Sequence, residues 1–163
     1  MNTPWFAIRT RARAEKVVHQ QLCKKGIESF LPTITRWSRW KDRRKEIDWP
    51  LFPGYCFASF TMADRLDTLK CRGVAGIVSF GGEPAPVAEL EIQSLKILVE
   101  STLRYDCAPF IREGSLVEVV HGPLTGAVGR LIRKGKRARL VLSVNLICQG
   151  ASVEVDAADV VPY

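Results

Sequence analysis

The sequence is poor in the residue spacings that build metal centres. Its five cysteines are scattered without a Cys-x-x-Cys pair, and the two histidines, His19 and His121, lie near no group of cysteines. We therefore expect no metal and no cofactor. An odd number of cysteines without a disulfide framework is typical of reduced thiols, which favours a cytoplasmic protein.

Catalytic motifs are missing as well. The sequence contains no Gly-x-Ser-x-Gly, phosphate-binding loop, His-Glu-x-x-His or paired-carboxylate pattern. Gly81-Gly82 has neither the lysine nor the spacing of a phosphate cradle. These absences argue against an enzyme, and turnover of a nucleotide substrate is the observation that would revive that class.

Long apolar runs are absent too. No segment approaches the roughly 18 continuous apolar residues that cross a bilayer, and the N-terminus lacks the apolar stretch of a signal peptide. With 47% apolar and 25% charged residues, the 163-residue chain has the composition of one globular domain or two small ones. Its 24 Lys and Arg against 17 Asp and Glu give a charge of +7, which favours a polyanionic partner; a merely soluble basic protein is the alternative.

The first part of the chain mixes strand and helix patterns. We expect strands at residues 5–8, 29–35, 55–60 and 77–80, with Pro32 at a sheet edge or bulge. Helices are expected from Ala14 to Gly26, from about residue 64 to 71 with Leu66 and Leu69 inward, and after Pro86. Residues 36–48 are strongly basic with two tryptophans and predict a hairpin or extended loop.

The second part has a different pattern. Short β-rich runs recur at residues 116–120, 127–132, 139–144, 152–155 and 160–161, separated by glycines and charged turns. This pattern predicts a small five-stranded barrel.

Several segments, taken in order, carry a family resemblance. They are Trp5-Phe6-Ala7-Ile8, Phe30-Leu31-Pro32, Pro50-Leu51-Phe52-Pro53-Gly54-Tyr55, Gly73-Val74, the run 77–82, Pro84-Ala85-Pro86-Val87 and the run from Gly114 to Gly129. Together they resemble the NusG family of transcription elongation factors over nearly the whole chain. Pro50-Leu51-Phe52-Pro53 and residues 140–147 are closer to its specialised branch, the RfaH and UpxY-type antiterminators.

The resemblance implies an α+β fold in two domains. Residues 1–106 would form a NusG-type N-terminal α/β sandwich, an antiparallel sheet flanked by helices, and residues 107–111 a linker. Residues 112–163 would form a small all-β KOW barrel, with Gly114, Gly122, Pro123, Gly126 and Gly129 as the KOW motif. A monomer is expected. Trp49 replaces the acidic residue of a known interdomain lock, so we expect an open, all-β second domain.

The resemblance also implies a polymerase-binding surface. In the family an apolar concavity grips the clamp helices of the largest RNA polymerase subunit. The matching positions are Phe52, Tyr55, Phe57, Ile77, Val78, Phe80, Ile92 and Leu95. Phe52 and Tyr55, beside a Pro-Gly turn, are expected to be exposed anchors in an uncovered hollow, whereas Phe57 and Leu95 are better explained as core.

A second surface would bind non-template or upstream DNA. Candidates on the first strand and helix are Arg9, Arg11, Arg13, Lys16 and His19; those in the basic excursion are Arg36, Arg39, Trp40, Lys41, Arg43 and Arg44. A solvated helix face and a solubilising hairpin are the respective alternatives.

The function implied is transcription elongation and antitermination. The N-terminal domain would suppress pausing and termination, and the KOW domain would recruit ribosomal protein S10 or Rho. The alternative is a ribosome- or RNA-associated KOW-domain RNA-binding protein, which would leave the aromatic turn at residues 49–57 unexplained.

Overall fold

The computed structural model describes residues 3–40, 43–109, 114–134 and 137–163, with side chains placed outside residues 36–46, 109–113 and 134–136. The chain forms two compact units, Met1–Pro84 and Ala85–Tyr163. This division falls well before the domain boundary that the sequence predicted at residue 106. Among the described residues, no helix is long and apolar enough to cross a membrane.

The first unit is built on an antiparallel sheet in the order β2-β5-β1-β6. Its strands are β1 (Trp5–Thr10), β2 (Glu28–Phe30), β5 (Tyr55–Ser59) and β6 (Val74–Ile77). The first four residues of β1 are all buried, as expected of a continuous apolar run in the middle of a sheet. β2 is an edge strand, and Leu31-Pro32 separates it from β3, so the predicted strand 29–35 is broken at the proline.

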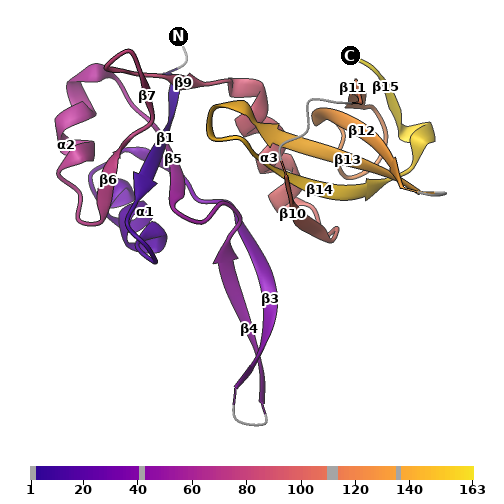
Figure 1. The fold of residues 1–163 in the computed structure, drawn as a ribbon, viewed down its shortest axis with the longest axis horizontal. Coiled ribbons are helices and arrows are strands. Elements are labelled where there is room, and N and C mark those ends of the chain that lie inside the picture. Colours follow the sequence, from indigo (N-terminus) through magenta and orange to yellow (C-terminus); the bar gives the residue numbers. More distant parts are fainter. Residues whose placement is uncertain (1–2, 41–42, 110–113, 135–136) are drawn as a thin grey trace. The chain divides into compact units, whose positions relative to one another are not determined.

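Helix α1 (Glu15–Lys24) covers one face of this sheet (Figure 1). Val18 and Leu22 are buried in a core with Ile8 and Cys56. Gly26 follows the helix with a φ of 77°, in the left-handed region where glycine commonly ends helices. The predicted helix is therefore confirmed.

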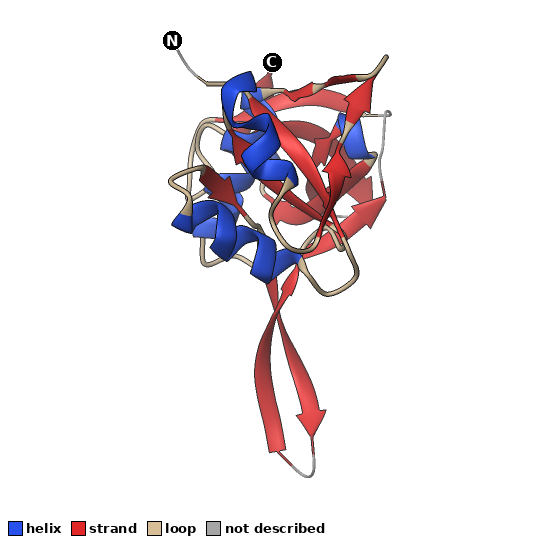
Figure 2. Ribbon diagram, turned by 90° about the vertical axis from the view of Figure 1, so that its left-hand side faces the viewer, coloured by secondary structure: helices blue, strands red, loops and turns tan. Residues whose placement is uncertain are grey.

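Strands β3 (Thr33–Trp40) and β4 (Arg43–Pro50) form a long hairpin. The register runs from Thr33 opposite Pro50 to Trp40 opposite Arg43. The hairpin projects away from the rest of the first unit as an isolated two-stranded ribbon (Figures 1 and 2). Of the two predicted forms, hairpin or extended loop, the chain adopts the hairpin.

A short helical segment follows β5, comprising η1 (Met62–Asp64) and α2 (Arg65–Leu69). The prediction that Leu66 and Leu69 point inward is wrong, because they are 66% and 38% exposed. Thr68 is buried instead, and its hydroxyl donates to the Asp64 carbonyl oxygen at 2.9 Å. In so short a helix, the position of the buried face depends on the tertiary contacts of a single turn.

The first unit ends in a small hairpin of β7 (Ser79–Phe80) and β8 (Glu83–Pro84). Gly81 and Gly82 connect the strands with φ values of 62° and 83°, the signature of a two-residue hairpin turn. The predicted strand 77–80 is therefore split, with Ile77 ending β6 and Val78 donating to the Ala7 carbonyl oxygen at 2.9 Å.

The second unit contains a six-stranded antiparallel sheet in the order β10-β14-β13-β12-β11-β15. The strands are β10 (Tyr105–Pro109), β11 (Ser115–Val119), β12 (Val128–Lys134), β13 (Arg137–Val144), β14 (Gln149–Val155) and β15 (Val160–Pro162), with η2 (Asn145–Ile147) and η3 (Ala157–Asp159) between them. All five predicted strands are present. β10 is an additional strand, and it occupies residues 107–109 of the predicted linker 107–111.

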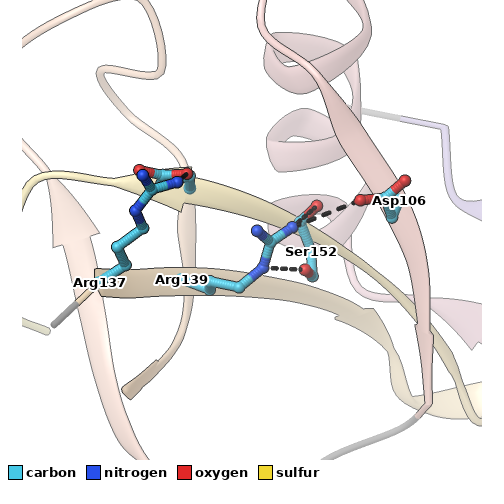
Figure 3. A network of polar contacts seen from close by, with 5 residues as sticks. Asp106, Arg137, Arg139 and Ser152 are labelled. Atoms are coloured by element: carbon cyan, nitrogen blue, oxygen red, sulfur yellow. Dashed lines mark hydrogen bonds and ion pairs between the residues drawn. The ribbon is translucent and has the colours of Figure 1, made fainter. Parts of the chain in front are cut away.

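β10 pairs with β14, and an arginine on β13 also reaches both strands (Figure 3). The Arg139 side chain on β13 donates to the Ser152 hydroxyl at 2.7 Å and to the Ser152 carbonyl oxygen at 3.3 Å. The same guanidinium lies 3.6 Å from the carboxylate of Asp106 on β10. Arg137 and Glu154, 3.3 Å apart and largely exposed, form a neighbouring pair that contributes little to stability.

The second unit also includes β9 (Pro86–Val87) and helix α3 (Glu89–Glu100), which packs on β12 and β13. The hydroxyl of Ser94 accepts from the Val128 N–H at 3.0 Å, and the Glu91 carboxylate accepts from the Asn145 N–H at 3.0 Å. Ile92, Leu95 and Leu98 on α3 are buried. The sequence predicted this helix as part of the first domain; its observed contacts are with the second sheet.

Candidate nucleic-acid and partner surfaces

Three arginines meet at one open hollow in the first unit. Arg11 and Arg13 follow β1, and Arg72 follows α2; together with Ala12, Ala14, Val17 and Gly73 they line a space of about 470 Å³. All three arginines are exposed. The hollow therefore combines two predicted nucleic-acid residues with Arg72, which the sequence analysis missed.

Hydrogen bonds of the backbone and of one side chain hold the segment after β1 and the segment after α2 together. The Arg11 N–H donates to the Gly73 carbonyl oxygen at 2.8 Å. The Gln21 side chain clamps Arg72 from both sides: its amide donates to the Arg72 carbonyl oxygen at 2.7 Å and accepts from the Arg72 N–H at 2.9 Å. The position of Arg72 therefore depends on a glutamine 51 residues away in the chain.

The approach of these segments requires a glycine. Gly73 has a φ of +92°, and a Cβ there would lie 2.8 Å from the Cβ of Ala14. Arg13, with a φ of 63°, also lies in the left-handed region, which is uncommon outside glycine. The sequence signal that identifies Arg72 is its place just before a glycine that joins α2 to β6.

The remaining candidates on β1 and α1 differ in accessibility. Arg9 and Lys16 are exposed, whereas His19 is half-buried. Nδ1 of His19 lies 2.8 Å from the Ser29 hydroxyl, and burial lowers the pKa of the imidazole below its usual value of 6.5. His19 is therefore mostly neutral at pH 7 and does not add a positive charge to this surface.

The predicted nucleic-acid-binding residues of the basic hairpin, apart from Lys41, lie on strands β3 and β4. Arg39 pairs with Arg44, and Trp40 pairs with Arg43, next to the tip. Arg36 lies further down β3, opposite Ile47. Lys41 lies outside the described residues, as do the side chains of the other five candidates.

The predicted polymerase-binding residues differ in exposure and do not form one exposed patch. Tyr55 is half-buried, and Phe80 at the β7–β8 hairpin is 86% exposed. The expectation that Phe52 is exposed is wrong: it is 1% exposed and packs edge-on against Phe57, with ring centroids 6.2 Å apart. Phe57 is itself fully buried and stacks on Phe30.

The register of the sheet places Tyr55 and Ile77, two further predicted polymerase-binding residues, on opposite faces. Tyr55 lies opposite Arg9, which lies opposite Gly76, whereas Ile77 lies opposite Ile8. Because neighbouring residues of a strand point to opposite faces, Ile77 faces the α1 core and Tyr55 faces away from it. Val78 is half-buried, and Ile92 and Leu95 are buried in the second unit.

The KOW-motif residues occupy turns and close approaches in the second unit. Gly126 has a φ of +94°, and a Cβ there would lie 3.4 Å from Cδ1 of Ile97 on α3. Gly129 lies so close to β13 that a Cβ would come 2.5 Å from the Val141 carbonyl oxygen. Gly114 and Gly122 also have positive φ, with Pro123 next to the latter.

The first unit is a sheet with a basic strand–helix junction and a projecting hairpin, and the second unit is a further β-sheet with a helix packed on it, which defines a class of two-unit α+β proteins. Comparison with known proteins supports this class. The family described as "Transcription termination factor nusG" matches residues 3–96. The chain therefore belongs to the NusG family.

Similar proteins extend the match beyond that segment. The NusG transcription termination/antitermination protein of Lactococcus lactis is 26% identical, covering 93% of this chain and 89% of its own length. The corresponding protein of Streptococcus pyogenes is 24% identical over 86% of each chain. A solved structure of Thermotoga maritima NusG, entitled for its domain interaction, covers 96% of this chain with a TM-score of 0.53 and 20% identity, which supports the fold.

Proposed function

We propose that this protein is a specialised NusG-family elongation and antitermination factor. Its first unit binds the clamp helices of the largest RNA polymerase subunit and contacts non-template or upstream DNA. Its second unit recruits a further partner such as ribosomal protein S10 or Rho. The observation that supports DNA contact most directly is the hollow shared by Arg11, Arg13 and Arg72.

The hollow suits a strand of nucleic acid. Its lining combines three guanidinium groups with small or apolar side chains, and none of the described lining residues is acidic. Guanidinium groups bind phosphate in a bidentate manner and stack on bases. A single strand with unstacked bases offers both kinds of contact, so the non-template strand of a transcription bubble is a fitting ligand.

The β3–β4 hairpin supplies a second contact. It carries arginines at cross-strand positions 39 and 44 and projects from the sheet. At its base, Trp49 is 50% exposed. A projecting basic ribbon reaches duplex phosphates at a distance from the sheet, and such contacts weaken steeply as salt increases.

Polymerase binding is proposed for the exposed and half-buried apolar residues of the first unit. Phe80 is 86% exposed on the β7–β8 hairpin, so its ring is accessible to a partner. Tyr55 is the second accessible aromatic of the set. Large rings of this kind bury much area against a partner helix at little cost in side-chain entropy.

Simultaneous binding to the clamp helices and to DNA explains antitermination without chemistry. A factor that binds the closed clamp more tightly than the open one shifts the equilibrium toward the closed state. A difference of about 3 kcal/mol in binding free energy changes that equilibrium by roughly two orders of magnitude.

In vitro transcription through a pause and a terminator, with purified polymerase, tests this function. We expect Phe80→Ala and Tyr55→Ala to lose read-through on every template. Arg11→Ala/Arg72→Ala should lose it mainly where recruitment depends on the DNA sequence. Leu66→Ala and Lys70→Ala are matched controls, because these residues are exposed on or beside α2 and belong to neither surface.

Unchanged read-through with both aromatic variants would contradict the polymerase surface. Binding to ribosomes or RNA with equal strength in the absence of polymerase would instead favour an RNA-associated KOW protein.

A further inference from the structure

One glutamine of the first unit is bonded to two residues of the arginine hollow while lying behind its wall. Gln21 is half-buried on α1, one turn beyond Val17. Its Nε2 donates to the Arg72 carbonyl oxygen at 2.7 Å, and its Oε1 accepts from the Arg72 N–H at 2.9 Å. Nε2 also donates to the Val17 carbonyl oxygen at 3.4 Å. Val17 and Arg72 belong to the lining of the hollow, and Gln21 does not.

The side-chain amide of Gln21 bonds the backbone of Arg72 in the way that a neighbouring strand would. A primary amide carries two N–H protons and one carbonyl oxygen. One proton meets the Arg72 carbonyl oxygen, the other meets the Val17 carbonyl oxygen, and the amide oxygen meets the Arg72 N–H. The reverse orientation of the amide would place its NH₂ against the Arg72 N–H, so the bonding pattern itself fixes which end is oxygen.

Arg72 needs such support because it lies in a turn. The turn joins α2 to β6, and both backbone groups of Arg72 are bonded to Gln21. The next residue, Gly73, accepts from the Arg11 N–H at 2.8 Å, which fixes only the far end of the turn. Without the amide of Gln21, the N–H and the C=O of Arg72 would bond water, and the backbone that carries the guanidinium would be free to rotate.

Helix α2 has a separate tie to α1. Nζ of Lys25 donates to the Asp67 carbonyl oxygen at 2.8 Å, and neither residue lines the hollow. Loss of the Gln21 bonds therefore leaves α2 attached to α1 and acts on the turn at Arg72.

We propose that Gln21 is a positioning residue for nucleic-acid binding: it holds Arg72 beside Arg11 and Arg13, where one single strand contacts all three guanidinium groups. This inference rests on the proposed function, since it requires DNA contact at the hollow. Gln21 carries no charge and does not touch the strand. Its contribution is to reduce the conformational freedom that Arg72 would lose on binding.

The dependence of binding on salt separates this role from a general effect on stability. Each phosphate of a single strand that a protein neutralises contributes about −0.7 to the slope of log affinity against log salt concentration. Arg72→Ala removes one cation and should make the slope shallower by about 0.7. Gln21→Met changes no charge, yet it should make the slope shallower by a similar amount, because Arg72 is no longer held against the strand.

The test measures binding of the full chain to a fluorescent single-stranded DNA of mixed sequence, about 12 nucleotides long, by anisotropy at several salt concentrations. At low salt we expect Arg72→Ala to weaken binding about ten-fold and Gln21→Met about five-fold. Gln20→Met is the matched control, because Gln20 is an exposed glutamine one position earlier on the same helix. It should leave both the affinity and the slope unchanged.

The double variant decides whether Gln21 acts through Arg72. In the Arg72→Ala background, Gln21→Met should weaken binding no further, since the guanidinium that it positions is gone. An equal loss in both backgrounds would overturn the inference, because it indicates a general disturbance of the first unit. So would a Gln21→Met protein that binds as tightly as the unmodified chain while Arg72→Ala is weakened, and in that case the DNA contact itself stands. Failure of the unmodified chain to bind the DNA would instead overturn the DNA contact proposed for the hollow, and this inference with it.

Discussion

At the scale of single residues, burial decides which side chains can act. Phe52 and Tyr55 are neighbours of one Pro-Gly turn, yet the first is 1% exposed and the second half-buried. Their roles differ because Phe52 finds an aromatic partner in Phe57. Sequence shows that both are aromatic and next to a turn, but the direction in which each ring packs depends on residues brought close by folding.

Cys56 illustrates the same point with a measurable consequence. Burial, followed by the nearby Cys71, Glu15 and Cys23, raises the pKa of its thiol to about 12 from an ordinary value of 9.0. The folded state thus favours the protonated thiol. Its stabilising contribution is complete below about pH 9 and decreases as pH rises toward 12, because the unfolded chain then releases the proton more readily.

We therefore predict an alkaline loss of stability that depends on Cys56. In this range the free energy of unfolding should fall by up to about 1.4 kcal/mol for each pH unit on account of this thiol. Denaturant unfolding at several pH values would measure it. Cys56→Ala should be less stable at neutral pH but lack this part of the slope, and exposed Cys148→Ala should keep it. An identical slope in Cys56→Ala and the unmodified chain would refute the prediction.

At the scale of elements, periodicity predicts that a helix or strand exists but not what it packs against. The apolar side of α3 was visible as Ile92, Leu95 and Val99, and the helix is present. Its partner is the β12–β13 face of the second sheet. Polar contacts from Ser94 and Glu91, which periodicity does not detect, give this docking its specificity.

Ser94 should therefore contribute strongly to the second unit. Its side chain is 1% exposed and accepts from the N–H of the half-buried Val128, so Ser94→Ala removes the acceptor of that N–H. We expect a loss of about 1–3 kcal/mol, measured as a shift in the midpoint of denaturant unfolding. Ser101→Ala is the matched control, since its hydroxyl only bonds the Leu98 carbonyl oxygen at the end of the same helix. A Ser94→Ala protein as stable as the control would show that α3 does not depend on this bond.

At the scale of the whole molecule, the two units divide the chain differently from the two sequence patterns. The change from mixed to β-rich pattern near residue 106 suggested a boundary there, but α3 and β10 pack with the second sheet. Arg139 reinforces this assignment by bridging to Asp106. A boundary inferred from the sequence pattern marks where the type of secondary structure changes. The boundary between compact units lies where tertiary contacts are few, and the two need not coincide.

The division predicts how fragments behave. A fragment of residues 85–163 retains α3, β10 and the Asp106–Arg139 contact, whereas one of residues 112–163 lacks all three. We expect the longer fragment to unfold cooperatively and at a higher temperature in circular dichroism, because it keeps the buried apolar side of α3. Equal melting temperatures for the two fragments would indicate that α3 and β10 add nothing to the second unit.

The sequence alone determined the α+β class, the family resemblance, five strands of the second sheet and the basic character of the β1–α1 junction. These follow from local patterns of apolar, basic and glycine residues that are legible along the chain. Only tertiary structure decided that Arg72 joins Arg11 and Arg13, that Phe52 is buried and that α3 covers the second sheet. Each of these depends on contacts between segments that are distant in sequence. Such contacts form in the packing that buries the most apolar area and at the same time gives the buried polar groups their hydrogen-bond partners.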